Sequence, residues 1–305
     1  MIRFGVVGTA HWARAVHVPG LIATPGVELI GVAGRNPDKV RDIAQAHGIR
    51  AFSDFGAMLD RVDAVSLAVP PDAQPALACN AAEQGRHLLL EKPLAMTLAG
   101  ARAIRDSAMG KVSSIVFFMR RFVPEIERAI AATAATDWKH ARVRMHTCAL
   151  STRTPYTDSV WRQADRAALW DIGPHVLSIL IPVLGPVERI SARLGPDRLV
   201  ILSTVHARGA HAESSMTLHA SAESAVRDFT FAAHDRSMTL VEPTYDYRQA
   251  FVNAATELLS LIATGTHTHR CDAEFGYQVA RTLNAAERSI RSGETVTLDA
   301  IENVA

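Results

Sequence analysis

The sequence predicts an α/β protein. Its first part should form a doubly wound parallel sheet, and its second part an α+β domain with an open, mostly antiparallel sheet. Three observations support this prediction. Strand-like and helix-like segments alternate up to about residue 120, and five strand-like runs follow one another after about residue 187. The 305 residues also suffice for two domains of ordinary size, which we place at 1–120 and 121–305.

The expected strands of the first domain are short apolar runs. We expect strands at 2–7, 27–33, 51–52, 64–69, 88–90 and 114–119, and helices at 13–22, 38–47, 55–59, 73–84 and 98–108. Leu88 to Leu90 show no polar alternation, which is typical of a central strand covered on both faces. Alternating strands and helices favour a parallel sheet between two layers of helices.

Beyond residue 123 this alternation ends. We expect helices at 124–134, 168–184, 247–264 and 272–292, and strands at 142–148, 187–194, 199–206, 214–220, 225–232 and 237–241. Polar and apolar residues alternate from Arg227 to Phe231, which is typical of a strand with one buried face. Strands in succession without helices between them imply a mostly antiparallel sheet.

The first strand runs into a small-residue turn with the spacing of the Rossmann dinucleotide-binding fingerprint. Gly8 allows the tight turn, and Ala13 is small enough for close packing of helix against strand. Ala10 stands where a second glycine usually lets the backbone approach the pyrophosphate, so the match is incomplete. An ordinary strand–helix turn is the alternative interpretation. The expected binding residues of this turn are Gly8, Thr9, Ala10, His11 and Trp12.

The second strand is followed by Gly34 and Arg35. An NAD-binding protein usually carries an acidic residue here to hold the ribose hydroxyls. Arg35 instead offers a guanidinium group that suits a 2′-phosphate, so the sequence favours NADP and leaves NAD possible. A solvated arginine in a turn is the alternative interpretation.

Lys92 follows the apolar run at 88–90 and precedes Pro93. Proline cannot donate to a strand ladder, so the strand should end there. Lys92 is therefore expected at the carboxyl edge of the sheet, where α/β proteins bind ligands. A cis Lys92–Pro93 bond would fit such a turn. A solvated lysine at a strand end is the competing interpretation.

A second polar motif contains Asp171 and His175. Their spacing of four places them on one face at the start of a helix, with Asp171 near the cap and Pro174 in the first turn. Histidine suits proton transfer, and a nearby carboxylate can orient its ring. Simple capping by Asp171 is the alternative. No further ligand stands at metal-binding spacing, so we expect no metal.

Composition narrows the class of protein. The net charge is +1, and no apolar run is long enough to span a membrane, so neither a nucleic acid nor a membrane is an expected partner. The amino terminus enters a strand at once and lacks signal-peptide features. The three cysteines are odd in number and far apart, as expected in a reducing compartment. We therefore expect a cytoplasmic protein.

Three motifs together resemble those of the Gfo/Idh/MocA oxidoreductases. They are the Gly8 turn, Glu91-Lys92-Pro93 and Asp171-Ile172-Gly173-Pro174-His175. The resemblance covers nearly the whole chain. It implies an amino-terminal Rossmann domain, a carboxyl-terminal α+β domain whose open sheet often forms the oligomer interface, and a substrate held between the domains at the nicotinamide. In that family the residues corresponding to Lys92, Asp171 and His175 lie around the substrate. We accordingly expect a homo-oligomer, a dimer or a tetramer.

The resemblance also extends the expected binding residues. On the cofactor side it adds Val69, Pro70, Gln74, Glu91 and Lys92, and on the substrate side Arg121. Two of these depart from the family pattern, because relatives often have threonine and histidine where this chain has Val69 and Gln74. Residues 165–168 likewise replace glycines. Arg121, Arg153 and Trp161 suit a hydroxylated substrate such as a sugar or polyol.

The expected reaction is reversible hydride transfer between a carbinol carbon and a nicotinamide. His175 should accept the hydroxyl proton, Asp171 should orient His175 or a substrate hydroxyl, and Lys92 should stabilise charge on the reacting oxygen. Two alternatives on the same scaffold remain open. One is an NAD-dependent glycoside hydrolase, and the other is a regulatory protein that binds NADP(H) without turnover. The presence of both Lys92 and His175 favours an enzyme.

Overall fold

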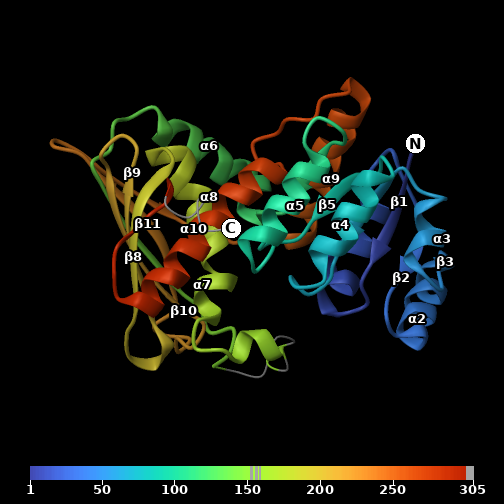
Figure 1. Cartoon of the computed structure of the whole chain (residues 1–305), viewed down its shortest axis with the longest axis horizontal. Helices are drawn as coiled ribbons and strands as arrows, with labels where there is room; N and C mark the ends of the chain where they lie inside the picture. Colours follow the sequence, from blue (N-terminus) through green and yellow to red (C-terminus); the bar gives the residue numbers. More distant parts are fainter. Residues whose placement is uncertain (152–153, 155–156, 158, 300–305) are drawn as a thin grey trace. The chain divides into compact units, whose positions relative to one another are not determined.

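A computed structural model describes residues 1–151, 154, 157 and 159–299 (Figure 1). The chain forms two compact units. Unit 1 contains Met1–Val123 and Tyr245–Gln278, and unit 2 contains Pro124–Thr244 and the chain from Val279 onward. This differs from the expected division into 1–120 and 121–305, because a segment from the later part of the chain packs within unit 1.

Unit 1 is built on a six-stranded sheet in the order β3-β2-β1-β4-β5-β6. All of its strand pairs are parallel. The order reverses between β1 and β4, as in a doubly wound nucleotide-binding fold. The predicted parallel sheet is confirmed. Its strands are β1 (Ile2–Val7), β2 (Val27–Ala33), β3 (Arg50–Ala51), β4 (Ala64–Leu67), β5 (His87–Leu90) and β6 (Ser114–Val116).

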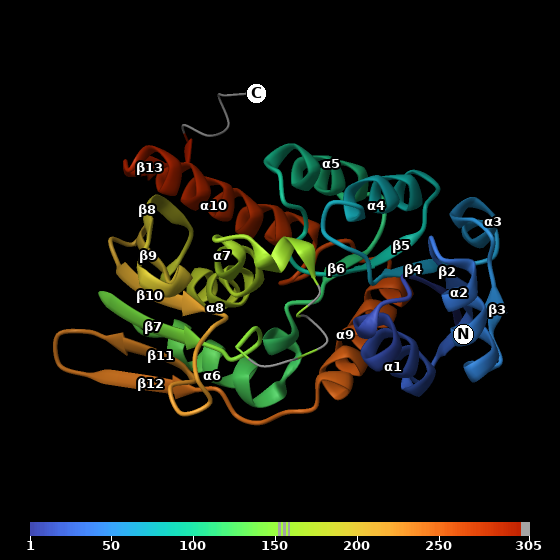
Figure 2. The same ribbon diagram turned by 90° about the horizontal axis from the view of Figure 1, so that it is seen from below.

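Helices cover both faces of this sheet. Figure 2 shows α4 and α5 over one face and α1 and α9 over the other. Helix α9 contacts α1, β5 and β6, which explains why residues 245–278 belong to unit 1. The helical segments are a π-helical turn η1 (Ala13–His17), α1 (Val18–Ala23), α2 (Pro37–His47), α3 (Phe55–Leu59), α4 (Gln74–Glu83), α5 (Leu98–Ala108), a 3-10 turn η2 (Met119–Phe122), α9 (Tyr247–Thr264) and the start of α10 (Ala273–Ser292).

Local signals in the sequence explain where these elements begin and end. Every residue of β4 is buried, as expected for a central strand. Helix α2 begins where the Asn36 side chain accepts a hydrogen bond from the Lys39 amide, and it ends at Gly48 in the left-handed region. The Thr97 side chain caps α5 in the same way. The strands and helices of unit 1 are therefore encoded largely by local sequence.

Unit 2 contains a seven-stranded sheet in the order β12-β11-β7-β10-β9-β8-β13. Only the β10–β7 pair among its described strands is parallel, so the predicted mostly antiparallel sheet is confirmed. Strand β13 is not among the strands predicted from the sequence. The strands are β7 (His140–His146), β8 (Val187–Leu194), β9 (Val200–His206), β10 (His211–Thr217), β11 (Val226–Ala232), β12 (Ser237–Val241) and β13 (Val296–Thr297).

The helix expected at 168–184 is divided in two. Helix α7 ends at Asp171, and α8 begins at Gly173 with Pro174 in its first turn. Pro174 has no amide hydrogen to continue the hydrogen-bond ladder of α7. Ile172 occupies the cap position of α8, directly after Asp171, so Asp171 lies next to the cap and Pro174 in the first turn, as predicted. The alternative of side-chain capping is not supported, because α8 has no side-chain hydrogen bond at its cap. The helical segments of unit 2 are α6 (Pro124–Ala134), η3 (Val160–Gln163), α7 (Ala167–Asp171), α8 (Gly173–Leu184), η4 (Pro196–Arg198) and the remainder of α10.

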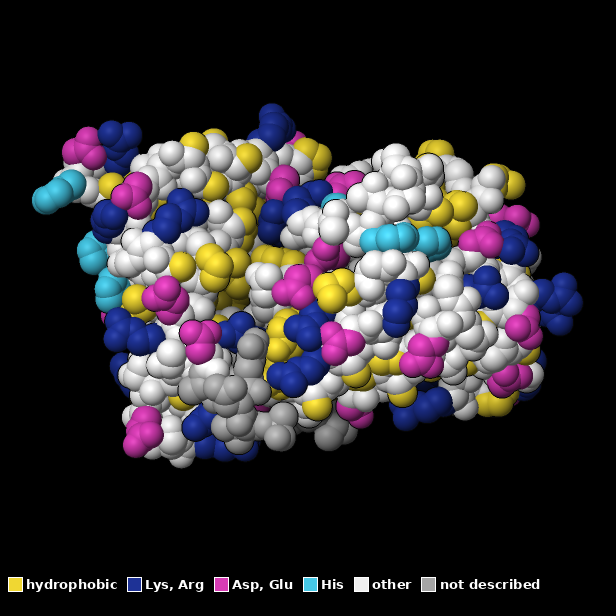
Figure 3. All heavy atoms as spheres, turned by 45° about the horizontal axis from the view of Figure 1, so that its top comes forward, with side chains coloured by type: hydrophobic (Ala, Val, Ile, Leu, Met, Phe, Trp, Pro, Cys, Tyr) yellow, Lys and Arg dark blue, Asp and Glu magenta, His cyan; other side chains and the backbone are white. Residues whose placement is uncertain are grey.

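Two surface properties bear on function. Figure 3 shows basic and acidic side chains interspersed over the face it presents, in keeping with the net charge of +1. Among the described helices, none is long and apolar enough to cross a membrane.

Candidate functional site

The turn after β1 is held between the ends of two neighbouring strands. The Gly8 amide donates to Ala33 O at 2.9 Å, at the end of β2. Gly8 has a φ of 130°, and a Cβ atom added there would lie 2.2 Å from Ala68 O, after β4. Only glycine accommodates this conformation and this approach. The glycine of the predicted fingerprint is therefore required by the backbone.

The residues after Gly8 enter a helix directly. Helical backbone begins at His11, and Ala10 and His11 are exposed, whereas Thr9 and Trp12 are half-buried. Arg14 donates to Thr9 O at 3.2 Å and to Lys39 O at 3.3 Å, which ties this turn to α2. Amide groups at the start of a helix favour an anion, so the turn suits a pyrophosphate.

Arg35 lies after the end of β2 and is exposed. The neighbouring Asn36 is engaged in capping α2. Residues 34–37 contain no carboxylate that could hold both hydroxyls of a ribose. The end of β2 thus presents a cation where NAD-binding domains usually present an acid.

The turn after β5 is fixed by a buried amide. The Lys92–Pro93 peptide bond is cis, as the sequence suggested. Gln74 is fully buried, and its Nε2 donates to Glu91 O at 2.8 Å and to Leu94 O at 2.9 Å. Its Oε1 accepts from the Glu91 amide at 2.9 Å. Gln74 therefore shapes the turn that carries Lys92, and we expect Gln74 to affect cofactor binding through that turn.

Glu91 joins the turn after β5 to the turn after β1. Its Oε1 accepts from Trp12 Nε1 at 2.5 Å and lies 3.0 Å from His17 Nε2. The other nitrogen of His17 lies 2.8 Å from Ser66 Oγ on β4. Sequence reasoning missed His17 and Ser66. Their contacts span up to 74 residues, and no local pattern signals them.

Three further predicted residues of unit 1 lie in different surroundings. Val69 and Pro70 follow β4 and are half-buried and exposed, respectively. Arg121 lies in η2 and is only 3% exposed, with its guanidinium 5.8 Å from the centre of the Phe275 ring. A contact between Arg121 and a substrate remains a prediction.

The backbone at Arg121 is held by an ion-pair cluster. Arg270 donates to Arg121 O at 3.0 Å and to Glu257 Oε1 at 2.9 Å. Burial raises the pKa of Glu257, but hydrogen bonds from His269 and Arg270 outweigh burial and lower it to about 2. This cluster fixes η2 against α9.

In unit 2, Asp171 is bound by an arginine that sequence reasoning also missed. Arg162 Nε lies 2.9 Å from Asp171 Oδ2, and Arg162 Nη2 lies 3.2 Å from Oδ1. Both side chains are largely buried. The guanidinium also lies 4.2 Å from the centre of the Trp161 ring. Trp161 and Asp171, both predicted site residues, are thus brought together by Arg162.

His175 lies in the first turn of α8 and is 6% exposed. Its amide donates to Ile172 O at 2.9 Å. Asp171 and His175 are separated by the break between α7 and α8. Arg153, another residue expected near the substrate, lies outside the described residues.

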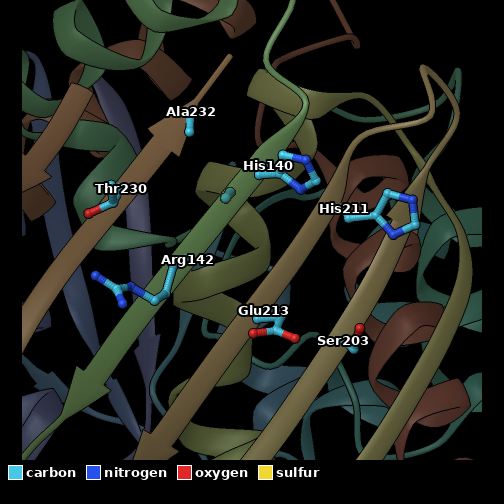
Figure 4. Close-up of a pocket in the computed structure, with 8 residues that line it drawn as sticks. His140, Arg142, Ser203, His211, Glu213, Thr230 and Ala232 are labelled. Atoms are coloured by element: carbon cyan, nitrogen blue, oxygen red, sulfur yellow. The ribbon is translucent and has the colours of Figure 1, made fainter. Parts of the chain in front are cut away.

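A separate hollow lies on the outer face of the unit 2 sheet (Figure 4). His140 and His211 lie side by side on paired strands, with ring centres 6.3 Å apart. None of the predicted site residues lines this hollow. Within the described residues, no group of three or more histidine, cysteine, aspartate or glutamate side chains could hold a metal.

Comparison with known proteins agrees with this geometry. The sheet order and the Gly8 turn define a Rossmann dinucleotide-binding domain. Residues 2–116 match the family model of Gfo/Idh/MocA proteins, described as "Oxidoreductase family, NAD-binding Rossmann fold". Residues 2–116 are thus similar to the NAD-binding domain of the Gfo/Idh/MocA oxidoreductases.

Several curated relatives are named for reactions of sugars or sugar nucleotides. A D-xylose 1-dehydrogenase (NADP(+)) of Haloferax volcanii is 28% identical over 98% of this chain and 100% of its own length. A dTDP-3,4-didehydro-2,6-dideoxy-alpha-D-glucose 3-reductase of Streptomyces antibioticus is 30% identical over 61% of this chain and 57% of its own. Matches to two other relatives cover only 30% and 62% of those proteins.

The fold has close structural neighbours. Levoglucosan dehydrogenase in complex with NADH and levoglucosan superimposes with a TM-score of 0.84. The match covers 97% of this chain and 98% of the other, at 20% identity. This likeness supports the fold of the whole chain.

Proposed function

We propose that this protein is an NAD(P)-dependent oxidoreductase that transfers hydride between a nicotinamide and a hydroxyl or keto carbon of a sugar or polyol. The observation that carries the proposal is the Gly8 turn between β1 and β4, where the strand order reverses. Open α/β sheets bind ligands at this point. Trp12, Glu91 and Lys92 lie at the same edge and are linked by hydrogen bonds.

The residues fit a dinucleotide at this edge. The Gly8 turn and the helical backbone from His11 would hold the pyrophosphate, and Arg35 would bind a 2′-phosphate. Bound there, the cofactor supplies or accepts the hydride. We favour NADP because Arg35 stands in place of the usual acid. One relative is named for NADP(+), and one structural neighbour holds NADH, so NAD is the alternative to be tested.

The protein's own residues would manage the proton and the charge. Removing hydride from a carbinol carbon also requires loss of the hydroxyl proton. In this proposal His175 accepts that proton, and Lys92 donates a hydrogen bond to the reacting oxygen. The bidentate contact with Arg162 fixes the Asp171 carboxylate, which would hold His175 or a substrate hydroxyl.

The proposed substrate class rests on the relatives. A xylose dehydrogenase, a galactose dehydrogenase and an inositol dehydrogenase occur among them. Each is named for a substrate with several hydroxyl groups. Arg121, Arg153 and Trp161 remain proposed substrate-side residues, since polar and aromatic side chains suit such a substrate.

We further propose that the protein forms homo-oligomers through the outer face of the unit 2 sheet. Residues of β9 alternate between buried and half-buried, so Ile201 and Val205 lie on the outer face with Ser203. Apolar side chains on a face that carries none of the described helices would be covered by the same face of a second copy. Light scattering of the purified protein, with Val205→Arg as the disrupting variant, tests this assembly.

An aldose and polyol screen with NADP⁺ and NAD⁺ tests the activity. The proposal predicts reduced nicotinamide accumulating with at least one sugar or polyol. Release of sugar from glycosides without net reduction of cofactor would instead favour the glycoside hydrolase. Nucleotide binding with no turnover of any substrate would favour the regulatory protein.

A further inference from the structure

We propose that His17 is a positioning residue for the cofactor site. It holds the Glu91 carboxylate, and through it the Trp12 indole and the backbone of Lys92. The inference rests on the proposed function for its catalytic meaning, but the contacts themselves lie wholly within unit 1.

The contacts of His17 indicate which ring nitrogen donates to Glu91. The side chain is fully buried, with its ring centre 4.5 Å from that of Phe251. Its Nε2 faces Glu91 Oε1 at 3.0 Å, and its Nδ1 faces Ser66 Oγ at 2.8 Å. A carboxylate only accepts hydrogen bonds, so Nε2 must carry the proton, and the Ser66 hydroxyl can donate to Nδ1. A neutral ring satisfies both contacts.

The π-helical turn explains how two residues reach one carboxylate oxygen. Trp12 and His17 are five positions apart, and both contact Glu91 Oε1. Side chains five positions apart on an α-helix point about 140° apart, so they do not share a face. The π-helical turn at Ala13–His17 widens the backbone between them. Such turns occur frequently at functional sites.

Glu91 transmits this contact to the turn after β5. Its Oε2 accepts from the Lys92 amide at 3.2 Å, and its backbone is held by Gln74. The Glu91 side chain is 13% exposed, so its carboxylate faces inward. Without His17, the carboxylate would lose one of its two side-chain donors and could turn away from Trp12. The turn after β1 and the turn after β5 would then lose their common anchor.

Two substitutions of His17 separate this role from simple packing. In His17→Gln the side-chain amide can reach Glu91 from the place of Nε2, whereas in His17→Asn it can reach only Ser66. Both bury an amide of similar polarity. We expect His17→Asn to weaken NADPH binding about 10-fold, and His17→Gln to stay within about twofold of the parent protein. Nicotinamide fluorescence measures binding, and thermal unfolding shows that each variant is folded.

A second readout needs no nucleotide. The fluorescence emission of Trp12 is obtained as the difference between each protein and the same protein carrying Trp12→Phe. This emission should shift in His17→Asn and not in His17→Gln. If His17→Asn does not fold, Ser66→Ala replaces it, with an expected loss of NADPH affinity of about threefold.

The outcomes are distinct. A folded His17→Asn with parental NADPH affinity and parental Trp12 emission would overturn the positioning role. A parent protein that binds neither NADPH nor NADH would overturn the proposed function. A Trp12 shift confined to His17→Asn would still support the contact through Glu91.

Discussion

Gln74 and Glu91 form two hydrogen bonds with each other, one in each direction, immediately before the cis Lys92–Pro93 bond. The fully buried side-chain amide of Gln74 thus makes the hydrogen bonds that water would otherwise make with the backbone on both sides of Lys92, the expected catalytic lysine. The strand end that presents Lys92 is held by a residue on α4 and by the carboxylate of Glu91, rather than by the strand ladder alone.

The contribution of Gln74 can be measured by replacing it with leucine. Gln74→Leu would leave the amide of Glu91 and nearby carbonyl groups buried without partners. We expect it to lower the free energy of unfolding by about 2–4 kcal/mol, measured by urea denaturation. Gln84→Leu, at the exposed cap position directly after the same helix, is the matched control and should change stability by less than about 0.5 kcal/mol. Equal effects of the two substitutions would show that the buried contacts contribute little.

Gly8→Ala should damage nucleotide binding as well as stability. Its Cβ would lie 2.2 Å from a backbone oxygen, so the turn must move. We expect at least about a tenfold loss of NADPH affinity by titration. Gly85→Ala is the control, because Gly85 also has a positive φ of 73° but no atom within 4 Å of the added Cβ. A Gly8→Ala protein that binds NADPH as well as Gly85→Ala would contradict the assignment of this turn.

His175→Ala tests the proposed proton acceptor. The substitution should lower kcat about 100- to 10,000-fold on a substrate found in the screen, with little change in NADPH affinity. His47→Ala, an exposed histidine on α2, should leave kcat unchanged. Unaltered turnover in His175→Ala would remove this residue from the mechanism.

The Glu257 cluster predicts how stability depends on pH. The pKa of Glu257 is lowered from 4.5 to about 2 in the folded protein, so its ionised form is the stabilised one. Its contribution is complete above pH 4.5 and is lost as the pH falls through about 2. The stability difference between the parent protein and Glu257→Gln should therefore shrink as the pH falls from about 6 to about 2. A difference that does not change over this range would contradict the assigned ion pairs.

Much of the fold could be predicted because it follows local patterns. The helices at 55–59, 98–108, 124–134 and 247–264 have the predicted bounds, as do the strands at 187–194 and 237–241. The membership of α9 in unit 1 could not be foreseen, because it depends on packing against α1, β5 and β6. Gly173 and Pro174 mark the break at Ile172, whereas the sequence predicts a single helix over 168–184.

The candidate site was predicted only where the sequence itself marks it. Glycine and proline at strand ends pointed to Gly8 and Lys92. His17 and Arg162 carry no such mark. His17 acts through a π-helical spacing, and Arg162 reaches Asp171 from a separate 3-10 turn. Both contacts depend on tertiary structure, which the hydrophobic periodicity of the sequence does not indicate.

Titration of the purified protein with NADPH and NADH shows whether it binds a nicotinamide dinucleotide and whether Arg35 holds the 2′-phosphate. Nicotinamide fluorescence would be followed for the parent, for Arg35→Ala, and for Arg61→Ala, an exposed arginine of the same unit, as the control. We expect NADPH binding that weakens about tenfold or more in Arg35→Ala and is unchanged in Arg61→Ala. Equal affinity of the parent and Arg35→Ala for NADPH would contradict the 2′-phosphate site. Failure of the parent to bind either nucleotide would contradict the proposed oxidoreductase function itself.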